Sequence, residues 1–131
     1  MRLKSENNLN PIHHQILELV EPHSKVIELG CGKGDLLLKL SSKIDTGVEI
    51  DNSKILIDQA LKKCNSKGLS NISFRCEKLK DYAIKRIYDT TIASLFFHVI
   101  PVADSVNLIH KIRASSNTIL ITAFCKPKTI K

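Results

Sequence analysis

Apolar and polar positions along the chain follow two alternating patterns. Short apolar runs rich in Val, Ile, Thr and Phe, a composition typical of strands, are separated by longer stretches in which apolar residues have helical spacing. The predicted strands are residues 25–29, 46–50, 71–75, 90–95 and 117–124.

Stretches with helical spacing lie before, between and after most of these runs. The first covers residues 11–21, with Asn10 as its cap and Pro11 in its first turn. A later helix is capped by Asn52 or Ser53 and ends near residue 66. The other predicted helices are residues 35–42 and 102–113, and residues 78–86 are predicted to form a short polar helix or a loop. Six side chains of the helix after position 53 are expected to face the sheet: Ile55, Leu56, Ile57, Ala60, Leu61 and Cys64.

Strands that alternate with helices through short links predict an α/β fold, with a mostly parallel sheet covered by helices on both faces. Right-handed crossovers then bring the functional residues to the carboxyl ends of the strands. The chain has 131 residues and 43% hydrophobic content, so we expect one domain over residues 1–131 with a real core. We find no internal repeat and no low-complexity linker.

The segment with the most chemical information is Glu28-Leu29-Gly30-Cys31-Gly32-Lys33-Gly34. It follows an apolar strand, and its glycines at alternate positions let the backbone turn sharply and leave peptide groups bare for a ligand. About 20 residues later the next strand ends near Glu49. A glycine turn, a helix and an acid at the tip of the next strand form the plan of a nucleoside-binding βαβ unit. Asp35 stands where a dinucleotide fingerprint needs glycine, which opposes NAD.

These residues resemble the class I S-adenosylmethionine-dependent methyltransferases. Residues 28–34 fit the E-x-G-x-G-x-G signature of that family, residues 47–51 resemble its second block, and residues 88–101 resemble its fourth-strand block. The resemblance covers nearly the whole chain and implies a Rossmann-like, doubly wound fold, S-adenosyl-L-methionine as cofactor, and methyl transfer as the activity. The family sheet continues past the fifth strand with a helix and an antiparallel pair, and we expect those strands to be missing here.

The resemblance also implies roles for individual residues. Glu28 would organise the glycine loop or reach the ammonium group of the cofactor through water; the alternative is a carboxylate that accepts only local amide hydrogen bonds. Glu49 would accept hydrogen bonds from the ribose hydroxyls. Asp51 would be a turn or helix-cap acid, because the next helix begins there, and the two residues would exchange roles if the alignment shifts. Glu77 would accept from the adenine amino group, with Asp81 or a backbone contact as alternatives. The expected cofactor-binding residues are Glu28, Gly30, Cys31, Gly32, Gly34, Glu49, Ile50, Glu77 and Ser94.

The segment after the fourth strand resembles the part of the family that lies between cofactor and methyl acceptor. His98 is the candidate catalytic residue, because a histidine can act as a general base near neutral pH. The motif N/D-P-P-Y/F of enzymes that methylate base amines is absent. Phe96 and Phe97 could stack on adenine or favour the sulfonium cation, or they could belong to the core.

The net charge of +7, from 20 basic and 13 acidic residues, raises RNA as a candidate partner. Only four of the basic residues are arginine and aromatic residues make up 5% of the chain, whereas arginine and aromatic side chains are what grip exposed bases. Dispersed, solvated lysines are therefore the favoured explanation of the charge. We therefore favour a small-molecule methyl acceptor and keep RNA as the alternative.

The four cysteines form no C-x-x-C pair and no metal-finger spacing, so no metal site is predicted. Scattered cysteines suit the cytoplasm, and we expect neither a signal peptide nor a membrane span. Three other function classes stay open: a non-catalytic or degenerate S-adenosylmethionine-binding subunit that dimerises or binds a partner through the fifth strand, an NAD-binding oxidoreductase, and a basic RNA-binding accessory protein.

Overall fold

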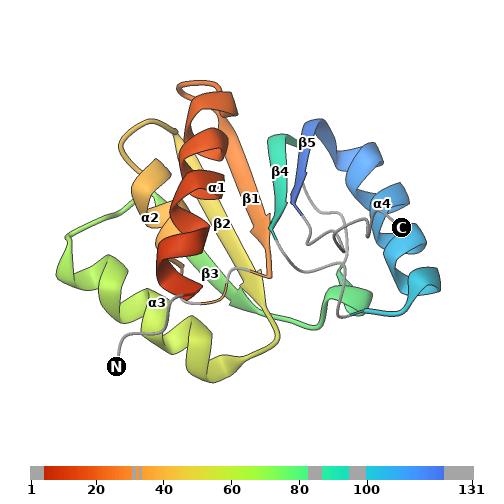
Figure 1. The fold of residues 1–131 in the computed structure, drawn as a ribbon. Helices are drawn as coiled ribbons and strands as arrows, with labels where there is room; N and C mark the ends of the chain where they lie inside the picture. Colours follow the sequence, from red (N-terminus) through yellow and green to blue (C-terminus); the bar gives the residue numbers. More distant parts are fainter. Residues whose placement is uncertain (1–4, 31, 33, 83–86, 95–99, 123–131) are drawn as a thin grey trace, which may run out of the picture.

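The computed structural model describes residues 5–30, 32, 34–82, 87–94 and 100–122. Five strands form one sheet in the order β3-β2-β1-β4-β5, and each neighbouring pair is parallel (Figure 1). The strands are β1 (Lys25–Leu29), β2 (Thr46–Asp51), β3 (Ile72–Cys76), β4 (Tyr88–Ser94) and β5 (Ser116–Thr122). The predicted parallel α/β fold is therefore confirmed.

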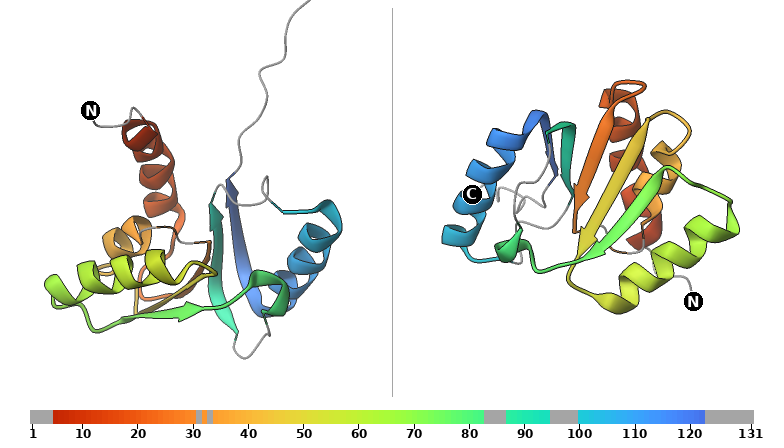
Figure 2. Two further views of the ribbon diagram at one scale, coloured as in Figure 1. Left: turned by 90° about the horizontal axis from the view of Figure 1, so that it is seen from below. Right: turned by 180° about the vertical axis from the view of Figure 1, so that it is seen from behind.

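The helices lie on both faces of this sheet. They are α1 (Ser5–Leu19), α2 (Asp35–Leu40), α3 (Lys54–Ser66) and α4 (Val102–Ser115), with a short 3-10 helix, η1 (Leu79–Asp81), between β3 and β4. Figure 2 shows α1, α2 and α3 on one face and α4 with η1 on the other. None of the helices in the described ranges has the length and apolar character that crossing a bilayer requires.

The helix predicted for residues 11–21 begins earlier and ends earlier than expected. It runs from Ser5 to Leu19, so Pro11 lies inside it and Asn10 is not its cap. The fixed φ of proline fits a helix, and the missing N–H removes one backbone hydrogen bond, so the ring weakens the ladder without ending the helix.

The other boundaries differ from the predictions by one or two residues. Helix α2 ends at Leu40, where the Ser41 N–H donates to Leu38 O, three residues back, instead of continuing the α-helical pattern. Helix α3 begins where expected, and the Ser53 side chain caps it by accepting from the Leu56 N–H at 3.3 Å. The region predicted as a short helix or loop before β4 contains only η1 in its described part.

Two groups of buried apolar side chains fix the sheet between its helices. On one face, Val26 of β1 packs with Ile16 of α1, the leucines of α2 and Cys64 of α3. On the other face, Ile27 and Leu29 of β1 pack with Ile50, Tyr82 and the α4 residues Leu108 and Ile112. Alternate residues of β1 thus face opposite layers, as the two-residue period of a strand requires.

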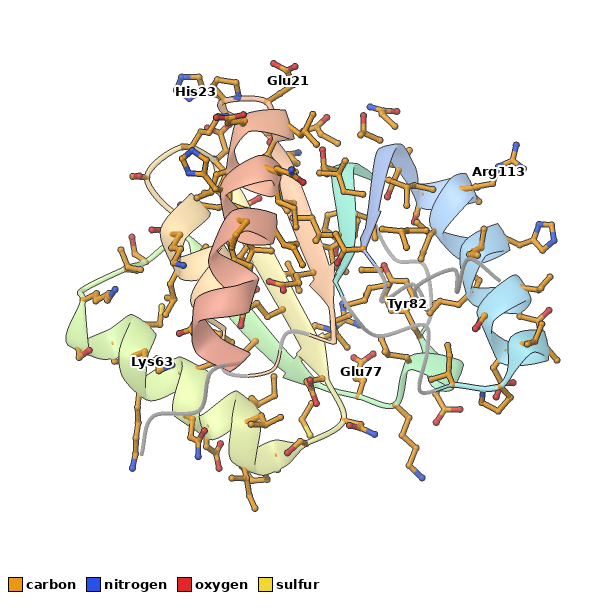
Figure 3. All side chains as sticks on the ribbon, in the orientation of Figure 1. Glu21, His23, Lys63, Glu77, Tyr82 and Arg113 are labelled. Carbon is orange, nitrogen blue, oxygen red and sulfur yellow. The ribbon has the colours of Figure 1, made fainter. Side chains whose placement is uncertain are left out.

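Because all five strands are parallel, their carboxyl ends meet at one edge of the sheet. The loop after β1, the tip of β2 and the segment after β3 come together at this edge. Figure 3 shows Glu77 at this end of the sheet and Glu21 and His23 at the opposite end. The fold therefore gathers most of the sequence-predicted site residues in one place.

Candidate functional site

The glycine loop after β1 is held against the tip of β2 by backbone hydrogen bonds. The Gly30 N–H donates to Ile50 O at 2.8 Å, and the Gly32 N–H donates to Asp51 Oδ2 at 3.2 Å. Gly30, Gly32 and Gly34 all have positive φ, between 56° and 78°. These three glycines therefore have left-handed backbone conformations, and two of them are anchored on the neighbouring strand.

Gly34 lies directly against the side chain of Glu49. A Cβ at position 34 would stand 2.7 Å from the Ala60 Cβ and 2.9 Å from Glu49 Oε2. Both distances are shorter than a normal contact, and the φ of 78° is one that side chains rarely adopt. The bend after β1 and the acid of β2, which the sequence predicts to act together, are thus in contact.

Glu28 and Glu49 lie side by side on the same face of the sheet. The β1–β2 register pairs Glu28 with Glu49 directly. Their chain neighbours Ile27, Leu29 and Ile50 point to the α4 face, so both carboxyl groups point to the face of α1, α2 and α3. Glu28 is 3% exposed and Glu49 is fully buried.

Burial is the main reason why the pKa of Glu28 is raised well above its usual value of 4.5, and the neighbouring charge of Glu49 raises it further. The charges of Asp35 and Asp51 act in the same direction. Glu28 Oε2 is buried and accepts no hydrogen bond among the described residues. A buried, unsatisfied carboxylate is costly, so the protonated form is the favoured one.

Asp51 fastens the loop to the helix that follows β2. Its Oδ2 accepts from the Gly32 N–H at 3.2 Å and its Oδ1 accepts from the Ser53 N–H at 2.8 Å. Both oxygens are thus used by backbone donors, and the side chain is 8% exposed. This geometry fits the turn and cap role rather than the exchange of roles with Glu49.

Glu77 lies at the same edge, but an arginine occupies one of its oxygens. Glu77 Oε1 accepts from Arg75 Nη2 at 2.7 Å and from Arg75 Nε at 2.9 Å. The Glu77 N–H donates to Asp51 O at 3.0 Å, which ties the segment after β3 to the tip of β2. Sequence reasoning missed Arg75; the signal was its position two residues before Glu77, on the same side of an extended chain.

The remaining predicted residues fall into two groups. The Ile50 side chain is fully buried on the α4 face, so only its backbone is near the glycine loop. Ser94 ends β4, where its backbone pairs with Thr122. Cys31, Phe96, Phe97 and His98 lie outside the described residues.

The described residues fit a ligand that offers hydroxyl donors and positive charge. The bare loop at Gly32 leaves open space where a Cβ would be, with no atom within 4 Å. The Glu49 carboxylate lies behind that loop as an acceptor, beside the Glu28 oxygen that has no partner among the described residues. In the described part of the chain, no group of His, Cys, Asp or Glu side chains could hold a metal ion.

The chain is similar in sequence to known proteins. Residues 26–117 match a family model described as a methyltransferase domain. In sequence, the chain is 32% identical over 127 residues to the tRNA/tmRNA (uracil-C(5))-methyltransferase of Campylobacter concisus, covering 87% of this chain and 34% of that protein. It is 29% identical over 92 residues to the 2-heptyl-1-hydroxyquinolin-4(1H)-one methyltransferase of Mycobacteroides abscessus, covering 67% of this chain and 40% of that protein.

Solved structures share the fold. The DhpI-SAM-HEP complex superposes with a TM-score of 0.80 and 19% identity, over 97% of this chain and 59% of that one. At this identity the likeness shows the fold alone. The chain spans about a third to two fifths of the length of the two curated relatives, at 34% and 40%.

Proposed function

Because this chain belongs to the class I S-adenosylmethionine-dependent methyltransferase family, we propose that it binds S-adenosyl-L-methionine and transfers the methyl group to an acceptor. The observation that carries the proposal is the contact between the glycine bend and the acid of β2. A Cβ at Gly34 would lie 2.9 Å from Glu49 Oε2, so bare peptide groups and a carboxylate stand together at the carboxyl edge of the sheet.

In this proposal the loop at Gly30, Gly32 and Gly34, with Cys31, surrounds the amino-acid end of the cofactor. Glu49 accepts hydrogen bonds from the ribose hydroxyls, each worth about 1.5–3 kcal/mol because the acceptor is charged. Asp51 holds the loop in place through the Gly32 N–H. Without that anchor, the loop would have to become ordered when the cofactor binds, and this ordering would weaken the affinity.

The adenine end involves the segment after β3. We propose that Glu77 accepts from the adenine amino group, with Arg75 fixing the orientation of its carboxylate. Asp81 or a backbone contact is the alternative, and the backbone of Ile50 is a further proposed cofactor contact. Ser94, at the carboxyl end of β4, completes the proposed cofactor contacts.

The cofactor supplies a methyl group on a positively charged sulfur, which is already activated for transfer. The protein therefore has to align the acceptor with that methyl group and exclude water, and such positioning can supply up to about 7–11 kcal/mol. His98 is the proposed general base, which is needed only if the acceptor must lose a proton.

For the acceptor we propose a small molecule, with RNA as the alternative. The two curated relatives support one reading each, since one is named for uracil in tRNA and the other for a hydroxyquinolone. The low share of arginine among the basic residues favours the small molecule. We also propose a single domain in the cytoplasm, where free thiols such as Cys64 and Cys76 persist.

A second candidate function is a cofactor-binding subunit without methyl transfer that associates through β5. This strand lies at the end of the strand order β3-β2-β1-β4-β5, and its residue Ile121 is 45% exposed. An edge strand with exposed apolar residues is a site where a second chain can pair. The subunit hypothesis predicts a homodimer that binds the cofactor and does not turn it over.

Titration calorimetry with S-adenosylmethionine, S-adenosylhomocysteine and NAD tests the cofactor proposal. We expect both sulfur-containing ligands to bind, NAD not to bind, and Glu49→Ala to weaken binding. Binding of neither sulfur-containing ligand would overturn the proposal. Transfer of labelled methyl groups to small-molecule extract or to tRNA then separates the two acceptors, and absence of transfer with intact binding would support the subunit hypothesis.

A further inference from the structure

The site contains two buried acids side by side, and their protonation determines its charge. Glu28 and Glu49 are register partners on adjacent strands and point to the same face of the sheet. Glu28 is 3% exposed and Glu49 is fully buried, so water cannot screen one charge from the other. Two carboxyl groups that share a buried site do not both ionise near neutral pH.

Asp35 of α2 and Asp51 of β2 place further negative charge near Glu28. Other titratable groups on the elements packed around the pair include Lys39 of α2, Lys63 and Cys64 of α3, and His13 of α1. Lys63 Nζ donates to Asp35 Oδ1 at 2.8 Å, and Lys39 Nζ lies 3.3 Å from His13 Nδ1. Glu28 forms no ion pair among the described residues, and its Oε2 accepts no hydrogen bond there.

Glu49 is the member of the pair that is pressed against the glycine loop. Its two oxygens would lie 2.9 Å and 3.3 Å from a Cβ at Gly34. Glu28 lies beside Glu49 on β1, the strand from which the loop departs. If only one of the two is ionised, the charge therefore belongs next to the loop, and the proton belongs on Glu28.

We infer that Glu28 is a protonated, neutral residue that positions Glu49, so that the pair presents a single negative charge to the ligand. The part of this inference that concerns the ligand rests on the proposed function. It differs from one of the two roles that the family resemblance suggests, in which the Glu28 carboxylate reaches the ammonium group of the cofactor through water. The two roles make opposite predictions for Glu28→Gln, which has the shape of protonated glutamic acid and carries no charge.

Infrared spectroscopy of the free protein tests the protonation directly and needs no ligand. We expect the carbonyl stretching band of a protonated carboxylic acid in the wild type at neutral pH, shifted in heavy water and absent in Glu28→Gln. Glu21→Gln is the matched control, because Glu21 is exposed at the opposite end of the sheet (Figure 3) and its replacement should leave the band unchanged. A wild type without the band would overturn the inference, and this measurement holds even if Glu28→Gln does not fold.

Calorimetry with S-adenosylhomocysteine tests the consequence for binding. We expect the affinity of Glu28→Gln to stay within about threefold of the wild type, and that of Glu28→Leu to fall more, since leucine cannot donate to Glu49. A loss of about tenfold or more in Glu28→Gln, as expected when a charged partner is removed, would overturn the inference. If the wild type binds no S-adenosylhomocysteine, the proposed function fails while the infrared result still decides the state of Glu28.

Discussion

Replacing Gly34 by alanine tests whether the glycine loop is packed as tightly as the structure indicates. The new methyl group would stand 2.7 Å from the Ala60 Cβ and 2.9 Å from Glu49 Oε2, and Ala60 is itself fully buried. The Ala60 Cβ can move only with the backbone of α3, so the contact at 2.7 Å carries most of the expected cost, whereas the Glu49 carboxylate is the far end of a flexible side chain. The residue must also keep a φ of 78°.

The expected cost has two parts, and Gly68 separates them. A left-handed φ costs an alanine about 1–2 kcal/mol, partly offset by about 0.4–1 kcal/mol from the stiffer unfolded chain. Gly68 has a φ of 64° and no atom within 4 Å of a Cβ, so Gly68→Ala carries only this backbone part. Gly34→Ala adds overpacking, so we expect it to lower the free energy of unfolding by about 1–3 kcal/mol more than Gly68→Ala does.

Urea denaturation of both variants measures this difference, and Ala60→Gly provides a rescue. Removing the Ala60 methyl group eliminates the contact at 2.7 Å, so the double variant should be more stable than the sum of the single changes predicts, by about 1 kcal/mol. Equal costs for Gly34→Ala and Gly68→Ala, together with no coupling to Ala60→Gly, would refute the close packing of the loop over Glu49 and α3.

Three further predictions concern the acids of the site. Burial raises the pKa of Glu28 above 4.5, so the folded protein holds this proton more tightly than the unfolded chain does. The resulting stability is fully present below pH 4.5. It is lost as the pH rises toward the raised pKa, by up to about 1.4 kcal/mol per pH unit. Urea midpoints across pH should show this slope in the wild type and not in Glu28→Gln, and parallel curves would contradict it. Asp51→Ala removes the acceptor of the Gly32 and Ser53 N–H groups and should lower the free energy of unfolding, measured in urea, by about 2–4 kcal/mol. Asp51→Asn should lower it less. Equal losses in the two variants would mean that these hydrogen bonds do not contribute to stability. Glu77→Ala should weaken S-adenosylhomocysteine binding by about 3–30-fold in calorimetry and change stability by less than about 1 kcal/mol, whereas an effect of Asp81→Ala alone would reassign the adenine contact.

The succession of strands and helices along the chain is predicted well from the sequence, because short β-branched runs and glycine turns are local signals. The five strands, the cap at Ser53 and the neighbourhood of Gly34 and Glu49 all follow from such signals. The start of α1 at Ser5 does not, since a proline at position 11 is a local sign of a helix start and its tolerance inside a helix is not visible in the sequence.

Which side chains of a helix face the sheet depends on tertiary contacts and is predicted less well from the sequence. Ile55 and Leu61 were expected to face the sheet, but they are 71% and 42% exposed, because α3 buries only a narrow stripe of Ile57, Ala60 and Cys64. That expectation was wrong.

The charge state of the site also cannot be predicted from the sequence. The neighbour relation of Glu28 and Glu49 depends on the register between two strands, which no local pattern specifies. The low exposure that raises the pKa of Glu28 depends on helices from three other parts of the chain.

The most direct test of the account compares S-adenosylhomocysteine with its 2′-deoxyribose analogue on the wild type and on Glu49→Gln. If Glu49 accepts from the ribose, loss of the hydroxyl should weaken wild-type binding by about tenfold or more and should weaken binding to Glu49→Gln much less. The same loss in both proteins would show that the ribose lies elsewhere, and the assignment of the cofactor site around Gly34 and Glu49 would be wrong.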